Sequence, residues 1–174
     1  MPPSAPSGFS LRPARPADAR KMMEAHGSAV REKAAPFYGG DVLDAWSPPE
    51  IRDGRIARME QDISSGREVF VVAEDAAGEV IGFGAMAPDA GELRAVYVAA
   101  GHGGQGVGSA ILHHLEEAAR ASGVTGLRLD ASLNAESFYA AHGFVADGKG
   151  EHVFHSGARM ACVHMRKTLS RPLQ

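Results

Sequence analysis

The chain has 174 residues, of which 44% are hydrophobic and 22% are charged, and its formal net charge at pH 7 is −3. This composition is typical of one folded domain with a buried core, and it excludes a collagen-like or disordered chain. Because the chain is mildly acidic, it has no overall positive field to attract nucleic acid or an anionic membrane, so we expect neither partner.

The N-terminal sequence and the cysteine content indicate the compartment. Residues 1–16 contain no hydrophobic stretch of the kind that a secretory signal requires. Cys162 is the single cysteine, so it forms no disulfide within the chain, as is usual in a reducing compartment. We therefore expect a cytoplasmic protein. We expect residues 1–8 to form a disordered tail, residues 9–169 a single domain and residues 170–174 a C-terminal tail.

The first half of the chain predicts helices followed by consecutive strands. A strand, a helix that begins near a proline and a loop rich in glycine and proline are expected first, at residues 9–16, 16–35 and 36–49. A second helix carries apolar side chains at three- and four-residue spacing: Ile56, Met59 and Ile63. Three strands then follow, the first two joined by a turn at Gly78, and their ranges are 67–75, 80–87 and 91–100.

The second half predicts one crossover and two more strands. After a glycine-rich loop, a helix shows an apolar stripe that comprises Val107, Ala110, Ile111, His114, Leu115 and Ala118, and Gly123 ends it. The remaining elements are a strand, a short helix and two strands, at 125–132, 134–143, 144–150 and 157–169. Antiparallel strands followed by one strand–helix–strand unit indicate a mixed α/β (α+β) sheet that is mostly antiparallel.

The glycine-rich loop predicts an anion site. Five glycines lie within eight positions, at Gly101, Gly103, Gly104, Gly106 and Gly108. Such a loop leaves backbone N–H groups uncovered at the start of a helix, where the helix dipole also favours negative charge. Phosphate is therefore the natural ligand. A Walker A loop is excluded because Gly108 is followed by Ser109 and not by lysine.

A dinucleotide-binding loop is an alternative. The spacing Gly101-x-Gly103-x-x-Gly106 matches its fingerprint, and Asp130 follows at about the distance expected for an acid that binds a ribose. Two observations oppose this interpretation. A hairpin precedes the loop, and too little chain follows Asp130 for the rest of a doubly wound sheet.

Two segments together resemble the GCN5-related N-acetyltransferase (GNAT) superfamily. "ELRAVYVAAGHGGQGVGSAIL", residues 92–112, resembles its motif A, Arg/Gln-x-x-Gly-x-Gly/Ala, with Gly106 and Gly108 at the two glycine places. "NAESFYAAHGF", residues 134–144, resembles a later motif of the same family, in the expected order. The chain departs from motif A at Gly103, where the family usually has Arg or Gln, and Ala100 stands where proline is common.

The resemblance implies a GNAT-type fold with helices on both faces of the sheet. It also implies an acetyl-CoA-dependent N-acetyltransferase that acts on a primary amine of a small molecule or peptide by direct attack in a ternary complex, and a possible homodimer. A degenerate domain that binds CoA as a sensor or scaffold remains an alternative because of Gly103. The cofactor contacts implied by position are Val96, Tyr97, Val98, Gly103, Gly104, Gln105, Gly106, Val107, Gly108, Ser109 and Asn134.

The same resemblance implies catalytic roles for two residues. Tyr139 is expected from its place in the motif to protonate the leaving CoA thiolate, although the residues around it, Phe138 and Phe144, would by themselves indicate a core aromatic. Glu92 is expected to take the amine proton, directly or through water, although a solvated carboxylate at a strand end would look the same. Asn134 either caps the short helix or bonds the pantetheine arm. The Val98 N–H is expected to polarise the thioester carbonyl.

We expect no metal site. His113 and His114 are adjacent on a helix and so point apart, and the remaining histidines lie in no recognised ligand pattern: His152, His155 and His164. Cys162 is expected to be a buried small hydrophobe; a Cys–His nucleophile with His164 on the same strand face has no other support in the sequence. Trp46 is expected to anchor a packed loop, although the carboxylates of Asp41, Asp44 and Glu50 around it would also suit a cationic amine.

Overall fold

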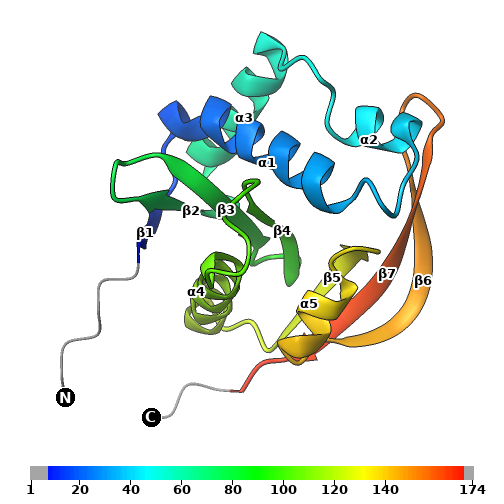
Figure 1. Ribbon diagram of the computed structural model, residues 1–174. Helices are drawn as coiled ribbons and strands as arrows, with labels where there is room; N and C mark the ends of the chain where they lie inside the picture. The colour runs from blue at the N-terminus through cyan, green and yellow to red at the C-terminus, as the bar shows by residue number, and fades with distance from the viewer. Residues whose placement is uncertain (1–7, 171–174) are drawn as a thin grey trace.

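A seven-stranded mixed sheet organises the protein in a computed structural model that describes residues 8–170 (Figure 1). The strands are β1 (Phe9–Pro13), β2 (Val69–Asp75), β3 (Val80–Ala87), β4 (Glu92–Val98), β5 (Gly126–Ser132), β6 (Val145–Val153) and β7 (Arg159–Thr168). Their order is β1-β2-β3-β4-β5-β7-β6, and β4–β5 is the parallel pair. The predicted mixed α/β sheet with one crossover is confirmed. The expected tails at residues 1–7 and 171–174 lie outside the described residues.

Helices cover both faces of this sheet. They are α1 (Ala19–Lys33), α2 (Gly40–Trp46), α3 (Asp53–Ser65), α4 (Val107–Ala121) and α5 (Glu136–Ala141), and a 3-10 turn, η1 (Pro16–Asp18), precedes α1. The larger core lies under α4 and α5, and a smaller one lies under α1 and α3. In the part of the chain that the structure describes, no helix has both the length and the hydropathy needed to span a membrane.

The prediction of a loop over residues 36–49 is wrong, because the segment contains α2. Gly39 stands in extended conformation just before the helix, with φ −71° and ψ 165°, and Gly40 is the first helical residue. Val42 then packs inward with a relative exposure of 5%. The two glycines that indicated a loop therefore mark the start of a short helix.

Helix α4 packs closely against β3 because that strand presents glycines. A side chain at Gly84 would come within 2.8 Å of the Leu115 side chain, and one at Gly82 would come within 3.2 Å of Ile111. Ile111 and Leu115 are fully buried, as the stripe predicted. His114 is exposed, however, because the buried face of α4 turns toward Leu112, Glu116 and Ala119 instead.

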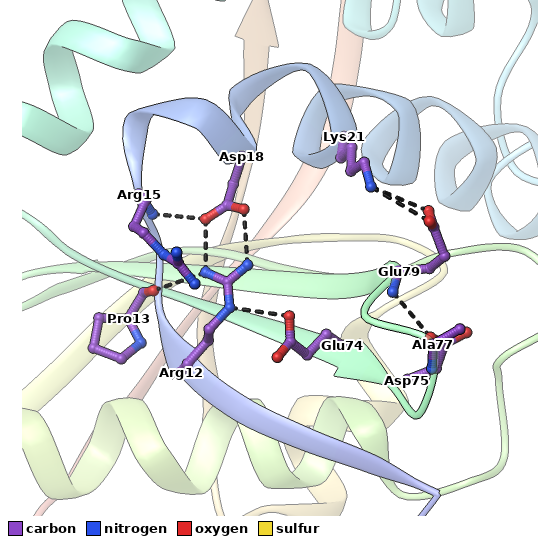
Figure 2. A network of polar contacts seen from close by, with 9 residues as sticks. All are labelled: Arg12, Pro13, Arg15, Asp18, Lys21, Glu74, Asp75, Ala77 and Glu79. Atoms are coloured by element: carbon purple, nitrogen blue, oxygen red, sulfur yellow. Dashed lines mark hydrogen bonds and ion pairs between the residues drawn. The ribbon is translucent and has the colours of Figure 1, made fainter.

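A charge network holds the edge of the sheet to the start of α1 (Figure 2). The Arg12 guanidinium donates to both Asp18 carboxylate oxygens at 2.8 Å and to Glu74 at 3.0 Å. Asp18 also accepts the Arg15 backbone N–H at 2.7 Å, and its relative exposure is only 8%. The hydrogen bonds from Arg12 hold the pKa of Asp18 below its usual value.

Candidate functional site

The parallel strands β4 and β5 separate toward their carboxyl ends. Among the described residues, Glu92–Arg128 is the single register pair that joins them. The opening forms part of a cavity of about 560 Å³. Its wall includes β4 from Leu93 to Val98, much of the glycine loop, the start of α4, and residues of α5, β5, β6 and β7.

Two residues of β4 turn their backbone groups into this opening. The Ala99 N–H donates to the Ile81 carbonyl at 2.8 Å. Because hydrogen-bonded and non-hydrogen-bonded pairs alternate along antiparallel strands, Tyr97 must be hydrogen-bonded to Phe83 in β3. Val96 and Val98 therefore direct their N–H and C=O groups away from β3, toward the cavity. Tyr97 contributes its ring to the cavity wall, and its backbone pairs within the sheet.

The glycine loop presents a run of unpaired backbone N–H groups. Gly101, Gly104 and Gly106 take left-handed conformations, with φ of 82°, 73° and 82°, and α4 begins directly afterwards. Within residues 8–170, no group accepts a hydrogen bond from the backbone N–H of any residue from 103 to 109. These N–H groups, at the positive end of the α4 dipole, form a site suited to phosphate.

Helix α1 holds the start of the glycine loop. The Ser28 hydroxyl accepts the Ala100 N–H at 3.0 Å, and the Glu32 carboxylate accepts the Gly101 N–H at 2.9 Å. The ammonium group of Lys33, the last residue of α1, lies 3.5 Å from the place that a Cβ atom at Gly103 would occupy. A positive charge from α1 thus lies beside the position where the family usually has Arg or Gln.

At the other end of the loop, the Ser109 hydroxyl is engaged by a histidine. Its Oγ lies 3.0 Å from His142 Nε2, while His142 Nδ1 contacts the Phe138 carbonyl at 2.8 Å. The Ser109 backbone N–H remains available for a ligand.

Asn134 and Tyr139 both line the cavity. The expectation that Asn134 caps α5 is wrong: the N-cap is Ala135 and no side chain bonds there, because the helix begins only at Glu136. The buried Asn134 side-chain oxygen has no hydrogen-bond partner in the described part of the chain. The Asn134 amide thus stays free for the other predicted role, a bond to the pantetheine arm.

The Tyr139 ring is held rigidly beside the cavity. It packs edge-on against Phe138 and Phe144, with ring centroids 5.2 and 5.6 Å apart, and its relative exposure is 8%. Burial raises the pKa of its hydroxyl well above the ordinary value, so the phenol stays protonated at neutral pH. No residue between 8 and 170 hydrogen-bonds this hydroxyl.

Glu92 lies at the closed end of the opening. Its carboxylate is 3.3 Å from the Arg128 guanidinium and 3.9 Å from that of Arg94, and its side chain is 32% exposed. Among the described residues, the part of the cavity wall that β4 forms starts at Leu93, and Glu92 does not line the cavity. The Glu92 carboxylate therefore does not lie where it would touch a ligand in the cavity.

Aromatic side chains form another wall of the cavity. Trp46 ends α2 and packs edge-on against His26, Tyr38 and Tyr97, with centroids 5.9 to 6.3 Å apart. This agrees with the expected packing role, and Trp46 also faces the cavity. Burial lowers the pKa of His26 to about 4, so its ring is neutral at pH 7.

Sequence reasoning missed His26 and Tyr38. The Tyr38 hydroxyl donates to the Ala161 carbonyl at 2.6 Å and accepts the Leu133 N–H at 2.8 Å, which joins three distant parts of the chain. No local pattern in the sequence signals such a contact.

A further set of polar side chains lines the cavity on β5 and β7. His164 Nδ1 lies 2.5 Å from Asp130 Oδ1, and Cys162 is close to both. The prediction that Cys162 and His164 share a face is confirmed, as is the burial of Cys162. Asp130, which the dinucleotide alternative assigned to a ribose, contacts His164 instead.

The comparison with known families identifies the chain. The acetyltransferase (GNAT) domain family matches residues 35–169. No protein with curated annotation matches the chain at a significant level.

Several solved structures share the fold. A GCN5-related N-acetyltransferase from Rhodopseudomonas palustris is 27% identical, with a TM-score of 0.83, over 94% of this chain and 97% of that one. The PaiA N-acetyltransferase from Thermoplasma acidophilum, solved with coenzyme A, is 18% identical, with a TM-score of 0.72, over 92% and 98% of the two chains. A phosphinothricin acetyltransferase from Sinorhizobium meliloti, solved with acetyl-CoA, is 21% identical, with a TM-score of 0.69, over 96% and 94%.

These findings decide between the two interpretations of the glycine loop. A dinucleotide-binding fold requires a doubly wound parallel sheet, whereas the observed sheet has one parallel pair, so that alternative is wrong. The family match covers most of the chain, including both sequence motifs. The protein therefore belongs to the GNAT acetyltransferase family.

Proposed function

We propose that the protein is an acetyl-CoA-dependent N-acetyltransferase that acetylates a primary amine of a small molecule or peptide in a ternary complex. The observation that carries the proposal is the run of unpaired backbone N–H groups from residue 103 to residue 109, at the mouth of a cavity between separated strands. Similar proteins solved with coenzyme A or acetyl-CoA support the choice of cofactor.

The cofactor would lie along the opening between β4 and β5. The backbone N–H groups of Gly103, Gly104, Gln105, Gly106, Val107, Gly108 and Ser109 would bind the pyrophosphate. Lys33 would add the positive charge that Gly103 itself lacks. The backbone of Val96 and Val98 and the Asn134 amide would bind the pantetheine arm.

Proton transfers accompany the exchange of the acetyl group. The attacking amine nitrogen forms a bond to the acetyl carbonyl carbon, and the carbon–sulfur bond breaks as the thiolate leaves. The Val98 N–H would stabilise the charge that develops on the carbonyl oxygen. Tyr139, whose hydroxyl is kept protonated by burial, would protonate the thiolate, and the second nitrogen proton, released as the amide forms, would return to the Tyr139 oxygen.

The base that deprotonates the amine is proposed to be Glu92, acting through water. Alkylammonium groups have a pKa near 10.4, so a proton must leave before attack. Because Glu92 is ion-paired outside the cavity wall, an intervening water is required to connect it with an amine held in the cavity.

The test is thiol release from acetyl-CoA against a panel of primary amines, with product mass as the second readout. We expect thiol release that depends on the amine, and a higher melting temperature with CoA but not with NAD. Binding of CoA without turnover on any amine would contradict catalysis and favour a CoA-binding scaffold. Failure to bind CoA would contradict both.

A further inference from the structure

Three side chains of types that can bind a metal ion lie together on one face of the sheet. Asp130 on β5 stands directly opposite His164 on β7, and Cys162 precedes His164 by two residues on the same strand. His164 Nδ1 lies 2.5 Å from Asp130 Oδ1. One ligand atom from each of the three residues lies within 4.8 Å of the other two. All three residues line the cavity described above.

The neighbouring strand β6 leaves room for this cluster. Gly150 stands opposite Cys162 and Gly148 stands opposite His164. A side chain at Gly150 would collide with His164 Nε2 and would lie 3.4 Å from Cys162 Sγ. Two glycines in the middle of a strand cost stability, since they add flexibility and no packing. Their presence here leaves space for the His164 ring and the Cys162 thiol.

The chemistry of the cluster fits a borderline-soft divalent ion. Thiolate, imidazole and carboxylate are the three ligand types that zinc binds, at about 2.0 to 2.3 Å, which places neighbouring ligand atoms about 3.4 Å apart. The observed ligand atoms lie within 4.8 Å of one another, so rotation of these side chains would bring them to that arrangement, with metal bonds in place of the contact between His164 and Asp130. Three protein ligands with one side open to a cavity are typical of zinc sites that also bind water or substrate.

We propose that Asp130, Cys162 and His164 bind one divalent transition-metal ion, with Zn²⁺ as the best match, and leave a coordination position that faces the cavity. If the proposed acetyltransferase function holds, this position opens on the same cavity as the cofactor site, and an acceptor's amine or carboxylate could occupy it.

A covalent nucleophile is the competing use of the same residues. A nucleophilic thiol would be acetylated by acetyl-CoA in the absence of any metal ion, whereas a set of thiolate, imidazole and carboxylate ligands binds the ion itself. Acetylation of Cys162 in metal-free protein is therefore the outcome that separates the two uses.

The test uses the full chain, stripped of metal and free of CoA, whose own thiol would compete for the ion. Calorimetric titration with Zn²⁺ should show one ion per chain. Titration with Co²⁺ should produce a thiolate-to-cobalt charge-transfer band, which requires the single cysteine. Cys162→Ser should abolish the band. His164→Gln and Asp130→Asn should each weaken Zn²⁺ binding by about 100-fold or more, beyond the range typical of outer-shell changes.

Two control variants replace the same residue types elsewhere on the surface. His113→Gln and Asp89→Asn alter exposed side chains outside the cluster and should leave the affinity for Zn²⁺ unchanged. Metal-free melting temperatures show whether each variant folds. Loss of affinity in the controls equal to that in the cluster variants would overturn the proposal. So would the absence of a Co²⁺ band in the folded wild type, or an acetylated Cys162 formed from acetyl-CoA in metal-free protein.

Discussion

The Lys33 ammonium group lies 3.5 Å from the place that a Cβ atom at Gly103 would occupy, so α1 supplies a positive charge beside the glycine loop. Lys33→Ala should raise the Kd for CoA about 2- to 5-fold, the range expected for one exposed ionic contact, with a smaller salt dependence. Calorimetry at two ionic strengths checks both effects. Lys21→Ala removes a charge near the opposite end of α1, where Lys21 pairs with Glu79, and should leave the Kd unchanged.

Gly106 is a position in the glycine loop where a side chain should disturb both the backbone and phosphate binding. Its φ of 82° strains any L residue, and a branched side chain would also obstruct the approach of a phosphate to the N–H groups. Gly106→Val should therefore raise the Kd for acetyl-CoA steeply. Gly78→Val is the matched control, because Gly78 has a φ of 80° and equally open space in a remote turn. Equal Kd values for the two folded variants would contradict the phosphate site.

Tyr139→Phe tests the proposed acid. The change keeps the ring and its contacts with Phe138 and Phe144, so thermal stability should change little. Loss of a general acid should lower kcat by roughly 10²- to 10⁴-fold, with the KM for acetyl-CoA nearly constant. An acyl donor with a more acidic leaving thiol should recover part of the rate. A kcat close to that of the wild type would remove Tyr139 from the mechanism.

Glu92→Gln tests the proposed base. If Glu92 takes the amine proton through water, kcat/KM at neutral pH should fall about 10²-fold or more. Glu68→Gln is the control, because Glu68 also pairs with Arg94, at 2.5 Å. A similar loss in both variants would show that the ion pairs, and not proton transfer, account for the effect.

The low pKa of Asp18 predicts how stability changes in acid. Because the hydrogen bonds from Arg12 depress this pKa in the folded state, the stabilisation is fully present above the unfolded pKa of about 3.9 and is lost as the pH falls through the folded value. Asp18→Asn should cost about 1 to 3 kcal/mol of unfolding free energy at neutral pH. Urea unfolding should show that the cost shrinks below about pH 4. Asp89→Asn changes an exposed residue and should leave the unfolding free energy unchanged, both at neutral pH and below about pH 4.

The succession of strands and helices near the cofactor site could be predicted because its signals are local. The turn at Gly78, the alternation in the flanking strands and the glycine loop before an apolar stripe all lie within short segments. The stripe placed Ile111 and Leu115 correctly in the core. It included His114 wrongly, since a pattern on one helix does not reveal how wide a face its neighbours cover.

The cavity wall opposite the glycine loop could not be predicted in the same way. The contact of Asp130 with His164 depends on the pairing of β5 with β7, which places side by side two strands that are not consecutive in the sequence. The free amide of Asn134 depends on where α5 begins, and helix boundaries are set by small local differences. The first feature depends on tertiary pairing and the second on the exact helix boundary, and local sequence patterns reveal neither.

The contacts of the Tyr38 hydroxyl also bear on the order in which the cavity assembles during folding. Its two hydrogen bonds join residues 123 and 95 positions apart in the chain. The β2–β3–β4 meander needs only short loops to close, whereas these contacts require the closure of long ones, which is slower. We therefore expect the cofactor-side strands to assemble first. The cavity is completed only when the chain has been synthesised through β7 and its early helices have docked against the late strands.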